Sequence, residues 1–145
     1  MYHGTTMMKN VITNDNGTYL FGDLDKGTYN INFQRNDNHG NGVSTADIVK
    51  IQRHILGIEN LNSPYKLIAA DVNATSSITA SDISEIRRLV LGVVNEFNKV
   101  ESWSFVPKAY VFPNVNSPWS APRSADVSIT KDNERLVEDF VAIDE

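Results

Sequence analysis

The chain of 145 residues contains no cysteine, only five prolines and only three histidines. Without cysteine no disulfide can stabilise the fold, so a bound metal ion is the expected substitute. No apolar run approaches the roughly twenty residues of a membrane-spanning helix, and we expect no membrane span. Residues 1–9 also lack the apolar stretch of a signal peptide, so an exported protein would be represented here by a mature or excised piece.

Groups of residues typical of enzymes are also missing. The sequence has no nucleophile elbow, no phosphate-binding loop and no histidine-rich metal pattern. His3, His39 and His54 are scattered, and His39 falls within a polar loop, where a neutral imidazole is a poor ligand for a hard cation. The net charge of −5, with no basic stripe, argues against a nucleic-acid partner. We therefore expect a protein that is not an enzyme, with a hydrolase as a remote alternative.

The clearest feature that is present is a segment that occurs twice, with a constant offset of 35 residues. Each copy has oxygen-bearing side chains at alternate positions, then an apolar residue, then an Asp that opens an amphipathic helix. The matched pairs are Asn36/Asp71, Asn38/Asn73, Val43/Ile78, Ser44/Thr79, Asp47/Asp82, Ile48/Ile83, Ile51/Ile86, Arg53/Arg88, Leu56/Leu91 and Gly57/Gly92. Such a match indicates one small structural unit used twice.

The second copy has the spacing of a calcium-binding loop. Calcium takes six to eight oxygen ligands, which a short loop supplies from alternate residues and a carboxylate in the following helix. Counted from the first ligand, positions one, three, five, seven, nine and twelve are Asp71, Asn73, Thr75, Ser77, Thr79 and Asp82. Ser76 stands where EF-hand loops have Gly, which implies some strain. The alternative is a polar turn whose Ser81 or Asp82 caps the next helix without a metal.

The first copy is poorer in charge. Its corresponding positions are Asn36, Asn38, Gly40, Gly42, Ser44 and Asp47. Neutral amides replace the leading carboxylate, although Asp37 supplies a charge if the loop is shifted by one residue. We expect either a second, weaker calcium site or a structural loop held partly by Asn side chains.

Helical periodicity follows each loop. Ile48, Ile51, Ile55 and Leu56 form one apolar face that stops at Gly57. The second helix repeats this face, with Gly92 as its stop, through Ile83, Ile86, Leu89, Val90 and Val93.

Two loops, each followed only by its exiting helix and a Leu-Gly ending, resemble a dockerin over residues 36–94. Dockerins are secreted bacterial modules that fold on calcium, and many bind cohesin domains. The resemblance implies partner contacts at loop positions ten and eleven and at a basic residue at eighteen. Those positions include Thr45 and Arg53 in the first copy, and Ser81 and Arg88 in the second. Ala46 and Ala80 replace the other small hydroxyl residues, a departure from the cohesin-binding pattern.

Alternation in residues 13–33 predicts a β-hairpin near the N-terminus. Asn16-Gly17 and residues 25–27 read as turns, Tyr19 and Phe21 alternate around polar neighbours, and Tyr29, Ile31 and Phe33 alternate again. This stretch resembles the closing strands of a collagen-adhesin B-type or carboxypeptidase-regulatory-like β-sandwich. That resemblance implies a non-catalytic spacer of an exported protein.

A second hairpin is predicted in the C-terminal third. Residues 126–130 alternate, residues 131–134 turn, and residues 136–143 run back as a strand. Before them, Trp103, Phe105, Tyr110 and Phe112 indicate one or two short strands, with Trp119 packed against the body of the protein. These aromatics suit the core of a small sheet or, alternatively, a surface that stacks on carbohydrate.

The sequence thus predicts an α+β protein in three parts: partial β-sandwich strands in 1–35, a two-helix dockerin-like calcium-binding pair in 36–98, and a C-terminal β segment in 99–145. Such a sandwich needs around seven strands, and this chain supplies about three before the loops. Either the C-terminal hairpin pairs with the N-terminal one, or a neighbouring copy donates strands. We expect a secreted or cell-surface, calcium-binding structural protein that assembles head-to-tail with copies of itself, or alternatively a dockerin that anchors a protein to a cohesin-type partner.

Overall fold

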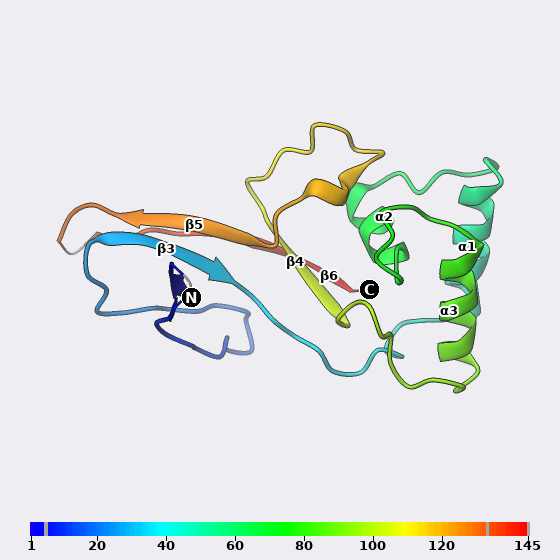
Figure 1. Ribbon diagram of the computed structural model, residues 1–145, viewed down its shortest axis with the longest axis horizontal. Helices are drawn as coiled ribbons and strands as arrows, with labels where there is room; N and C mark the ends of the chain where they lie inside the picture. The colour runs from blue at the N-terminus through cyan, green and yellow to red at the C-terminus, as the bar shows by residue number, and fades with distance from the viewer. Residues whose placement is uncertain (5, 133, 145) are drawn as a thin grey trace.

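A computed structural model describes residues 1–4, 6–132 and 134–144, and has an α+β fold with antiparallel sheets. The molecule is elongated, with strands at one end and helices at the other (Figure 1). The helices are α1 (Thr45–Ile55), α2 (Pro64–Ala70), α3 (Ala80–Val90) and the 3₁₀ turn η1 (Pro118–Ser120). The strands are β1 (Tyr2–His3), β2 (Thr6–Met7), β3 (Gly27–Asn32), β4 (Trp103–Pro107), β5 (Ser124–Ile129) and β6 (Phe140–Asp144).

The sequence repeat is confirmed as a structural repeat in α1 and α3. Both helices have eleven residues, and each begins with a capping box in which the third-residue Asp accepts the N–H of the N-cap residue at 2.9 Å. Both end at a glycine with positive φ, +68° at Gly57 and +70° at Gly92. There the next N–H reaches back to the carbonyl of Arg53 or Arg88, which is the Schellman arrangement. The predicted stops are therefore correct to the residue.

The prediction of two helices is wrong, because α2 lies between the repeats. Ser63 precedes it in an extended conformation and Pro64 occupies its first position, where a missing N–H costs nothing. The second loop therefore has an entering helix as well as an exiting one. With only seven residues, α2 is too short to produce a helical periodicity in the sequence.

The predicted N-terminal hairpin does not form as a strand ladder. The tight turn is present, because Gly17 N–H donates to Asn14 O at 2.8 Å, but residues 18–22 belong to no strand. Instead, β3 pairs with β5 in register from Gly27 opposite Ile129 to Asn32 opposite Ser124, and β1 lies on its other side. Tyr29 and Ile31 belong to this longer ladder and are buried. Tyr19, from the segment that forms no strand, packs its ring on Phe33 with ring centroids 4.9 Å apart.

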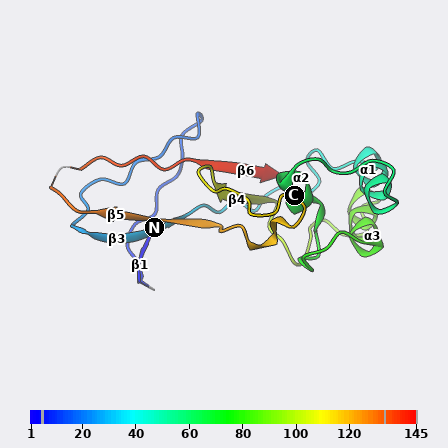
Figure 2. The ribbon, with the colours of Figure 1, turned by 90° about the horizontal axis from the view of Figure 1, so that it is seen from above.

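The predicted C-terminal hairpin is also wrong. β5 joins β3, whereas β6 pairs with β4 from Trp103 opposite Asp144 to Pro107 opposite Phe140. The four-stranded sheet has the order β2-β1-β3-β5, and β4-β6 forms a separate two-stranded sheet (Figure 2). The N-terminal strand therefore finds its partner within the same chain, the first of the two alternatives posed by the sequence.

Three small hydrophobic clusters hold the molecule together. The first joins α1 and α3 with Phe97; the second joins Ile68 of α2 to Val106 of β4 and Ile143 of β6; the third lies on β3 around Tyr29 and Ile31. Tyr110 and Phe112 pack beside the second cluster, and Trp119 is half-buried. The three predicted parts thus interlock, since 1–35 and 99–145 share a sheet. Within the described residues, no helix is long and apolar enough to cross a bilayer.

Candidate metal-binding site

The second loop runs from the end of α2 to the start of α3. Asp71 is the C-cap of α2, and Asp82 is the third residue of α3. The C-terminal end of a helix carries partial negative charge, which opposes a carboxylate placed there. An uncompensated Asp71 is therefore in an unfavourable position, and a nearby cation would relieve it.

Hydrogen bonds curl this loop around its first and last carboxylates, and the charge of Asp71 acts on Asp82. Asp71 accepts from the N–H of Thr75 at 2.9 Å and of Ser76 at 2.8 Å. Asp82 accepts from the N–H of Asn73 at 3.4 Å and of Thr79 at 2.9 Å. The carboxylate at the first ligand position thus accepts from the backbone at positions five and six. The carboxylate at the last position, twelve, accepts from the backbone at positions three and nine.

The hydroxyl residues at positions five, seven and nine, Thr75, Ser77 and Thr79, also form hydrogen bonds within the loop. Thr75 Oγ1 lies 3.3 Å from Ser77 O and 3.2 Å from Ser77 Oγ. Thr79 Oγ1 accepts from Ser81 N–H at 3.2 Å, and Thr79 is the N-cap residue of α3. The sequence-based alternative of Ser81 or Asp82 as N-cap is therefore wrong, although Asp82 takes part as the third residue of the capping box. The structure therefore brings all six predicted positions of the second copy into one hydrogen-bonded turn.

The backbone of this loop is strained where the sequence departs from EF-hand loops. Ser76 has φ +61° and Ala74 has φ +55°, in the left-handed region that favours glycine. Ile78 is half-buried and packs on the first hydrophobic cluster, as its position in the repeat predicts. A tight turn around a central point is the geometry that requires such φ values.

Burial makes the ionised form of the carboxylates in this loop energetically unfavourable. Asp82 is 0% exposed and Asp71 is 7% exposed. Burial raises the pKa of Asp82, and the neighbouring charge of Asp71 raises it further, while hydrogen bonds from Thr79 and Asn73 oppose the shift. Among the described residues, neither carboxylate forms an ion pair with Lys, Arg or His.

An acceptor without a donor lies in the same loop. Asn73 Oδ1 is the one buried side-chain nitrogen or oxygen in the described part of the chain that has no hydrogen-bond partner. Buried polar atoms are almost always satisfied, so such an atom calls for a specific explanation, for example an ion. Position three of a calcium loop points its oxygen at the metal, which would satisfy this atom.

The donor set is made of hard oxygen atoms. It combines two carboxylates with amide, hydroxyl and backbone carbonyl oxygens, a chemistry that suits calcium rather than zinc or copper. Residues 1–4, 6–132 and 134–144 contain no group of three or more His, Asp or Glu side chains that could hold a metal ion. A cation here would therefore depend on neutral oxygens for most of its ligands. The residues present fit calcium.

The first loop differs, because its side chains already have protein partners. Asn36 Oδ1 accepts from Ser102 N–H at 3.0 Å and lies 2.7 Å from His39 Nε2. His39 is 3% exposed, and its Nδ1 accepts from Phe97 N–H at 3.2 Å, so the Nε2–H donates to Asn36. Asn38 Oδ1 accepts from Gly40 N–H at 3.1 Å.

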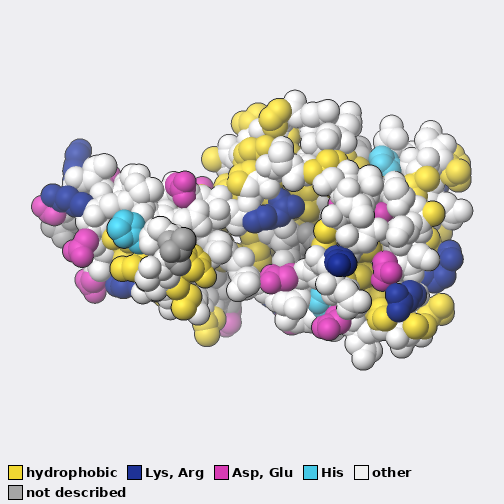
Figure 3. All heavy atoms as spheres, in the orientation of Figure 1, with side chains coloured by type: hydrophobic (Ala, Val, Ile, Leu, Met, Phe, Trp, Pro, Cys, Tyr) yellow, Lys and Arg dark blue, Asp and Glu magenta, His cyan; other side chains and the backbone are white. Residues whose placement is uncertain are grey.

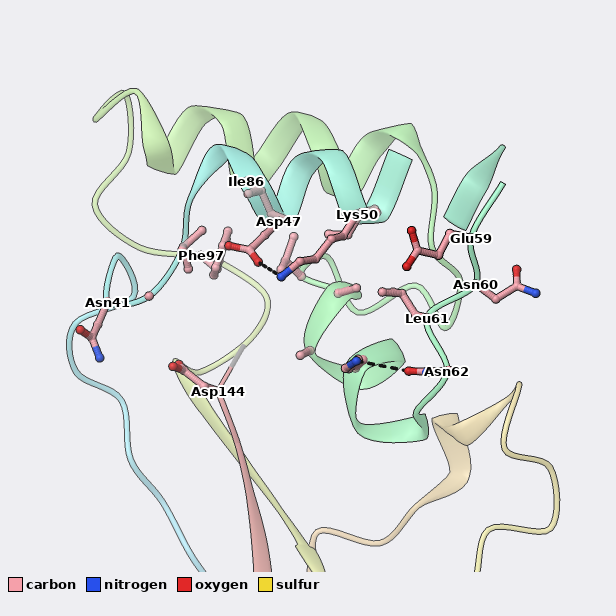
Figure 4. Close-up of a pocket in the computed structure, with 17 residues that line it drawn as sticks. Asn41, Asp47, Lys50, Glu59, Asn60, Leu61, Asn62, Ile86, Phe97 and Asp144 are labelled. Carbon is pink, nitrogen blue, oxygen red and sulfur yellow. Dashed lines mark hydrogen bonds and ion pairs between the residues drawn. The ribbon is translucent and has the colours of Figure 1, made fainter. Parts of the chain in front are cut away.

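The carboxylates near the first loop are also engaged. Asp37 pairs with Arg35 at 2.8 Å, and the hydrogen bond from that guanidinium holds the pKa of Asp37 below its usual range. Asp47 Oδ1 lies 3.6 Å from Lys50 Nζ at the mouth of a cavity of about 370 Å³ between α1 and α2 (Figure 4). Gly42 has φ +79° and lines the same cavity near Asp144. This geometry favours the structural-loop alternative.

The four residues expected to contact a partner lie on the surface. Arg53 pairs with Glu59 at 3.1 Å and Arg88 with Glu85 at 3.3 Å, and both guanidinium side chains are about half exposed. Thr45 and Ser81 are exposed in the first turns of α1 and α3.

Sequence reasoning missed His39 and Ser102 as residues that organise the first loop. Ser102 is fully buried and lies 65 residues from Asp37, whose N–H it accepts at 2.8 Å. No local pattern reveals a contact over such a separation. Comparison with known protein families, curated protein sequences and solved structures finds no match to this chain.

Proposed function

We propose that this chain is a non-catalytic, calcium-binding structural module of a secreted or cell-surface bacterial protein. One calcium ion is held by the loop from Asp71 to Asp82, with Asn73, Thr75, Ser77 and Thr79 supplying neutral oxygens. Calcium fixes the junction of α2 and α3, and through α2 it stabilises the contact with β4 and β6. The first loop is a structural element or a weaker second site.

The observation that carries this proposal is the partnerless oxygen of Asn73 beside two buried carboxylates. Each of these features is unfavourable without a cation: an unsatisfied buried acceptor costs about 1–3 kcal/mol. Together with the left-handed φ of Ser76 they describe a loop shaped for an ion at its centre. His39, another buried polar side chain, is accounted for by its two hydrogen bonds.

Calorimetric titration of EDTA-treated protein with calcium chloride tests the proposal, together with thermal unfolding in calcium and in EDTA. We expect a stoichiometry of one and a higher melting temperature in calcium. Asp82→Asn should abolish both effects, whereas the control Asp15→Asn, at an exposed position, should keep them. A stoichiometry of zero with equal melting temperatures would refute the calcium site.

The dockerin-like character is part of the proposal. It is supported by the paired capping boxes, the identical helix lengths and the matched glycine endings of α1 and α3. A secreted location is supported by the same resemblance, and millimolar extracellular calcium would fill even a weak site. The partial β-sandwich is supported by the face of β3 and β5 that carries Tyr29, Ile31 and Val127.

Self-association is the mode of action that we favour. β3 obtains its partners within the chain, but residues 18–22 and 134–139 flank it in no strand, so the second layer is incomplete. Completion by a neighbouring copy in a head-to-tail manner would build a fibre or a surface layer. Light scattering of the calcium-loaded protein over a range of concentrations tests this, and a constant monomer mass would oppose it.

Binding to a cohesin-type domain is the second candidate. The observation that favours it is the equivalent exposed placement of Arg53 and Arg88 on two matched helices, with Leu56 and Leu91 exposed at their ends. A pull-down with purified cohesins separates the two candidates. Capture that is lost in Arg53→Ala and Arg88→Ala would favour docking.

A further inference from the structure

The sheet half of the molecule contains an apolar groove. The groove encloses about 370 Å³ over one face of β3 and β5. Its floor includes Tyr29 and Ile31, with Val127 and Ile129 beside them. Its walls are residues 17–21 and residues 134–139, and Figure 2 shows both segments on the same side of β3 and β5.

Both walls offer unpaired backbone to an incoming chain. Among the described residues, no backbone–backbone hydrogen bond involves 19–22 or 135–138. A side-chain hydrogen bond links the two walls: Tyr19 Oη donates to Glu138 O at 2.6 Å. Unpaired, extended backbone beside an apolar surface is the usual acceptor for strand addition.

Each wall has an apolar side chain that is largely exposed to solvent. Leu20 and Val137, one on each wall, are each 76% exposed although they line the groove. Figure 3 shows further apolar side chains reaching the surface over this half of the molecule. A strand laid along the groove would cover Leu20 and Val137 together.

The same chain presents a segment suited to that position. We call residues Lys9–Thr13 the arm. It belongs to no helix or strand, although Val11, Ile12 and Thr13 are β-branched residues that favour strands, and Ile12 is 96% exposed. At about 3.3 Å per residue the arm spans roughly 17 Å, close to the roughly 20 Å of the 134–139 wall.

The arm is held at both of its ends by its own chain. Met1 N donates to Lys9 O at 3.0 Å, and Lys9 Nζ contacts the carbonyl oxygens of Gly22 and Asp23. Beyond the other end, Asn14 N–H donates to Thr18 O at 3.0 Å. An edge fixed in this way loses little conformational freedom when it binds.

The charges of the arm and the wall are complementary. The 134–139 wall carries Glu134, Glu138 and Asp139 against Arg135, a net charge of −2. Burial raises the pKa of Tyr19 in the opposite wall, and the charges of Glu138 and Asp139 raise it further. Lys9 is the one charged side chain of the arm. Its Nζ contacts backbone carbonyl oxygens of its own copy, and no carboxylate among the described residues pairs with it.

We propose that the groove over β3 and β5 binds the arm of a second copy of this chain, with Ile12 as the apolar anchor and the 134–139 wall as the strand partner. Since the arm and the groove are different surfaces, the contact is head-to-tail and can repeat without closing. The inference rests on the proposed self-association and names its two surfaces.

The absence of cysteine allows a direct test with two differently tagged copies, one Ile12→Cys and one Val137→Cys. Under mild oxidation in calcium we expect a mixed disulfide. In the matched control, the second copy carries Val111→Cys in place of Val137→Cys. Val111 is 82% exposed and lies outside the groove, so this pair should give little cross-linking. Equal yields from the two pairs would overturn the inference.

A second variant measures the anchor itself. Ile12→Asp should reduce the mass at high concentration to that of the 16.2 kDa monomer, whereas Val111→Asp should assemble as the parent does. Assembly that persists in Ile12→Asp would overturn the groove inference while leaving the proposed function intact. A parent that stays monomeric would overturn both self-association and the groove, and calorimetry would still decide the calcium site separately.

Discussion

His39 accepts a hydrogen bond from the backbone N–H of Phe97, 58 residues further along the chain, at 3.2 Å. Its other ring nitrogen donates to Asn36, so one buried imidazole connects the start of the first loop to the segment that follows α3. The ring of Phe97 packs against it with centroids 5.7 Å apart. These contacts fix the first loop against the segment that follows α3.

Replacing this imidazole should therefore destabilise the fold in a graded way. His39→Phe keeps a ring but leaves the N–H of Phe97 without its buried acceptor, a loss of about 1–3 kcal/mol in the free energy of unfolding. His39→Gln, whose amide can both accept and donate, should lose less. Urea unfolding measures both, and His3→Phe, at an exposed position, is the control. Equal losses for Phe and Gln would contradict the hydrogen-bond explanation.

Asn73→Ala should have opposite consequences with and without calcium. In EDTA the change removes a buried acceptor that has no donor, so the protein should be as stable as the parent or more stable. In calcium it removes a ligand and should weaken binding. The parent at a free calcium concentration one hundred times the dissociation constant gains about 2.7 kcal/mol, and the variant should gain less at the same concentration.

Thermal unfolding of Asn73→Ala and the parent in both conditions gives this comparison. A variant that is less stable in EDTA and responds to calcium as the parent does would indicate that Asn73 has a purely structural role.

The two helix endings should respond alike to substitution. Gly57 and Gly92 have φ near +70° and open space where a Cβ would lie, so Ala at either position costs backbone strain alone, about 1–2 kcal/mol. Gly22 also has open space but no positive φ, and Gly22→Ala should be neutral or slightly stabilising. Urea unfolding of the three variants is the measurement. A clear difference between Gly57→Ala and Gly92→Ala would show that the endings are not energetically equivalent.

Glu134 should make stability depend on acidity. Its carboxylate accepts from the N–H of Thr130 at 2.8 Å and of Lys131 at 3.2 Å, and these bonds, Thr130 first, lower its pKa in the folded state. A lowered pKa means that the contribution is complete above the ordinary pKa of Glu and is lost as the pH falls through the folded value. The difference in unfolding free energy between the parent and Glu134→Gln should shrink between pH 7 and pH 3. A difference that is constant with pH would exclude this role.

The helical repeat could be predicted from sequence because its determinants are local. The 35-residue offset, the Ser44 and Thr79 caps and the Gly57 and Gly92 stops lie within or beside the helices that they define, and α1 and α3 follow them. The oxygen-rich turn of the second loop was predictable for the same reason. α2 was not, because seven residues are too few to establish a period.

Strand pairing could not be predicted, because alternation specifies a strand and not its partner. Residues 27–32 and 124–129 both alternate, yet the sequence contains nothing that distinguishes β5 from residues 18–22 as the neighbour of β3. The contacts of His39 and Ser102 could not be predicted either, because they join residues about sixty positions apart. The proposed difference in calcium binding between the two loops rests on these contacts.

The pairing of β3 with β5 has a consequence for biosynthesis. Asn30 and Asp126, which lie opposite each other in the ladder, are 96 residues apart, so a ribosome adding about 5–20 residues per second delivers the second strand several seconds after the first. During that interval Tyr29 and Ile31 have no ladder to shield them, while the helices can already condense. A nascent chain that stalls before residue 124 would therefore expose the apolar face of β3 without its partner strand. A chaperone would be most useful at this step, before β5 pairs with β3.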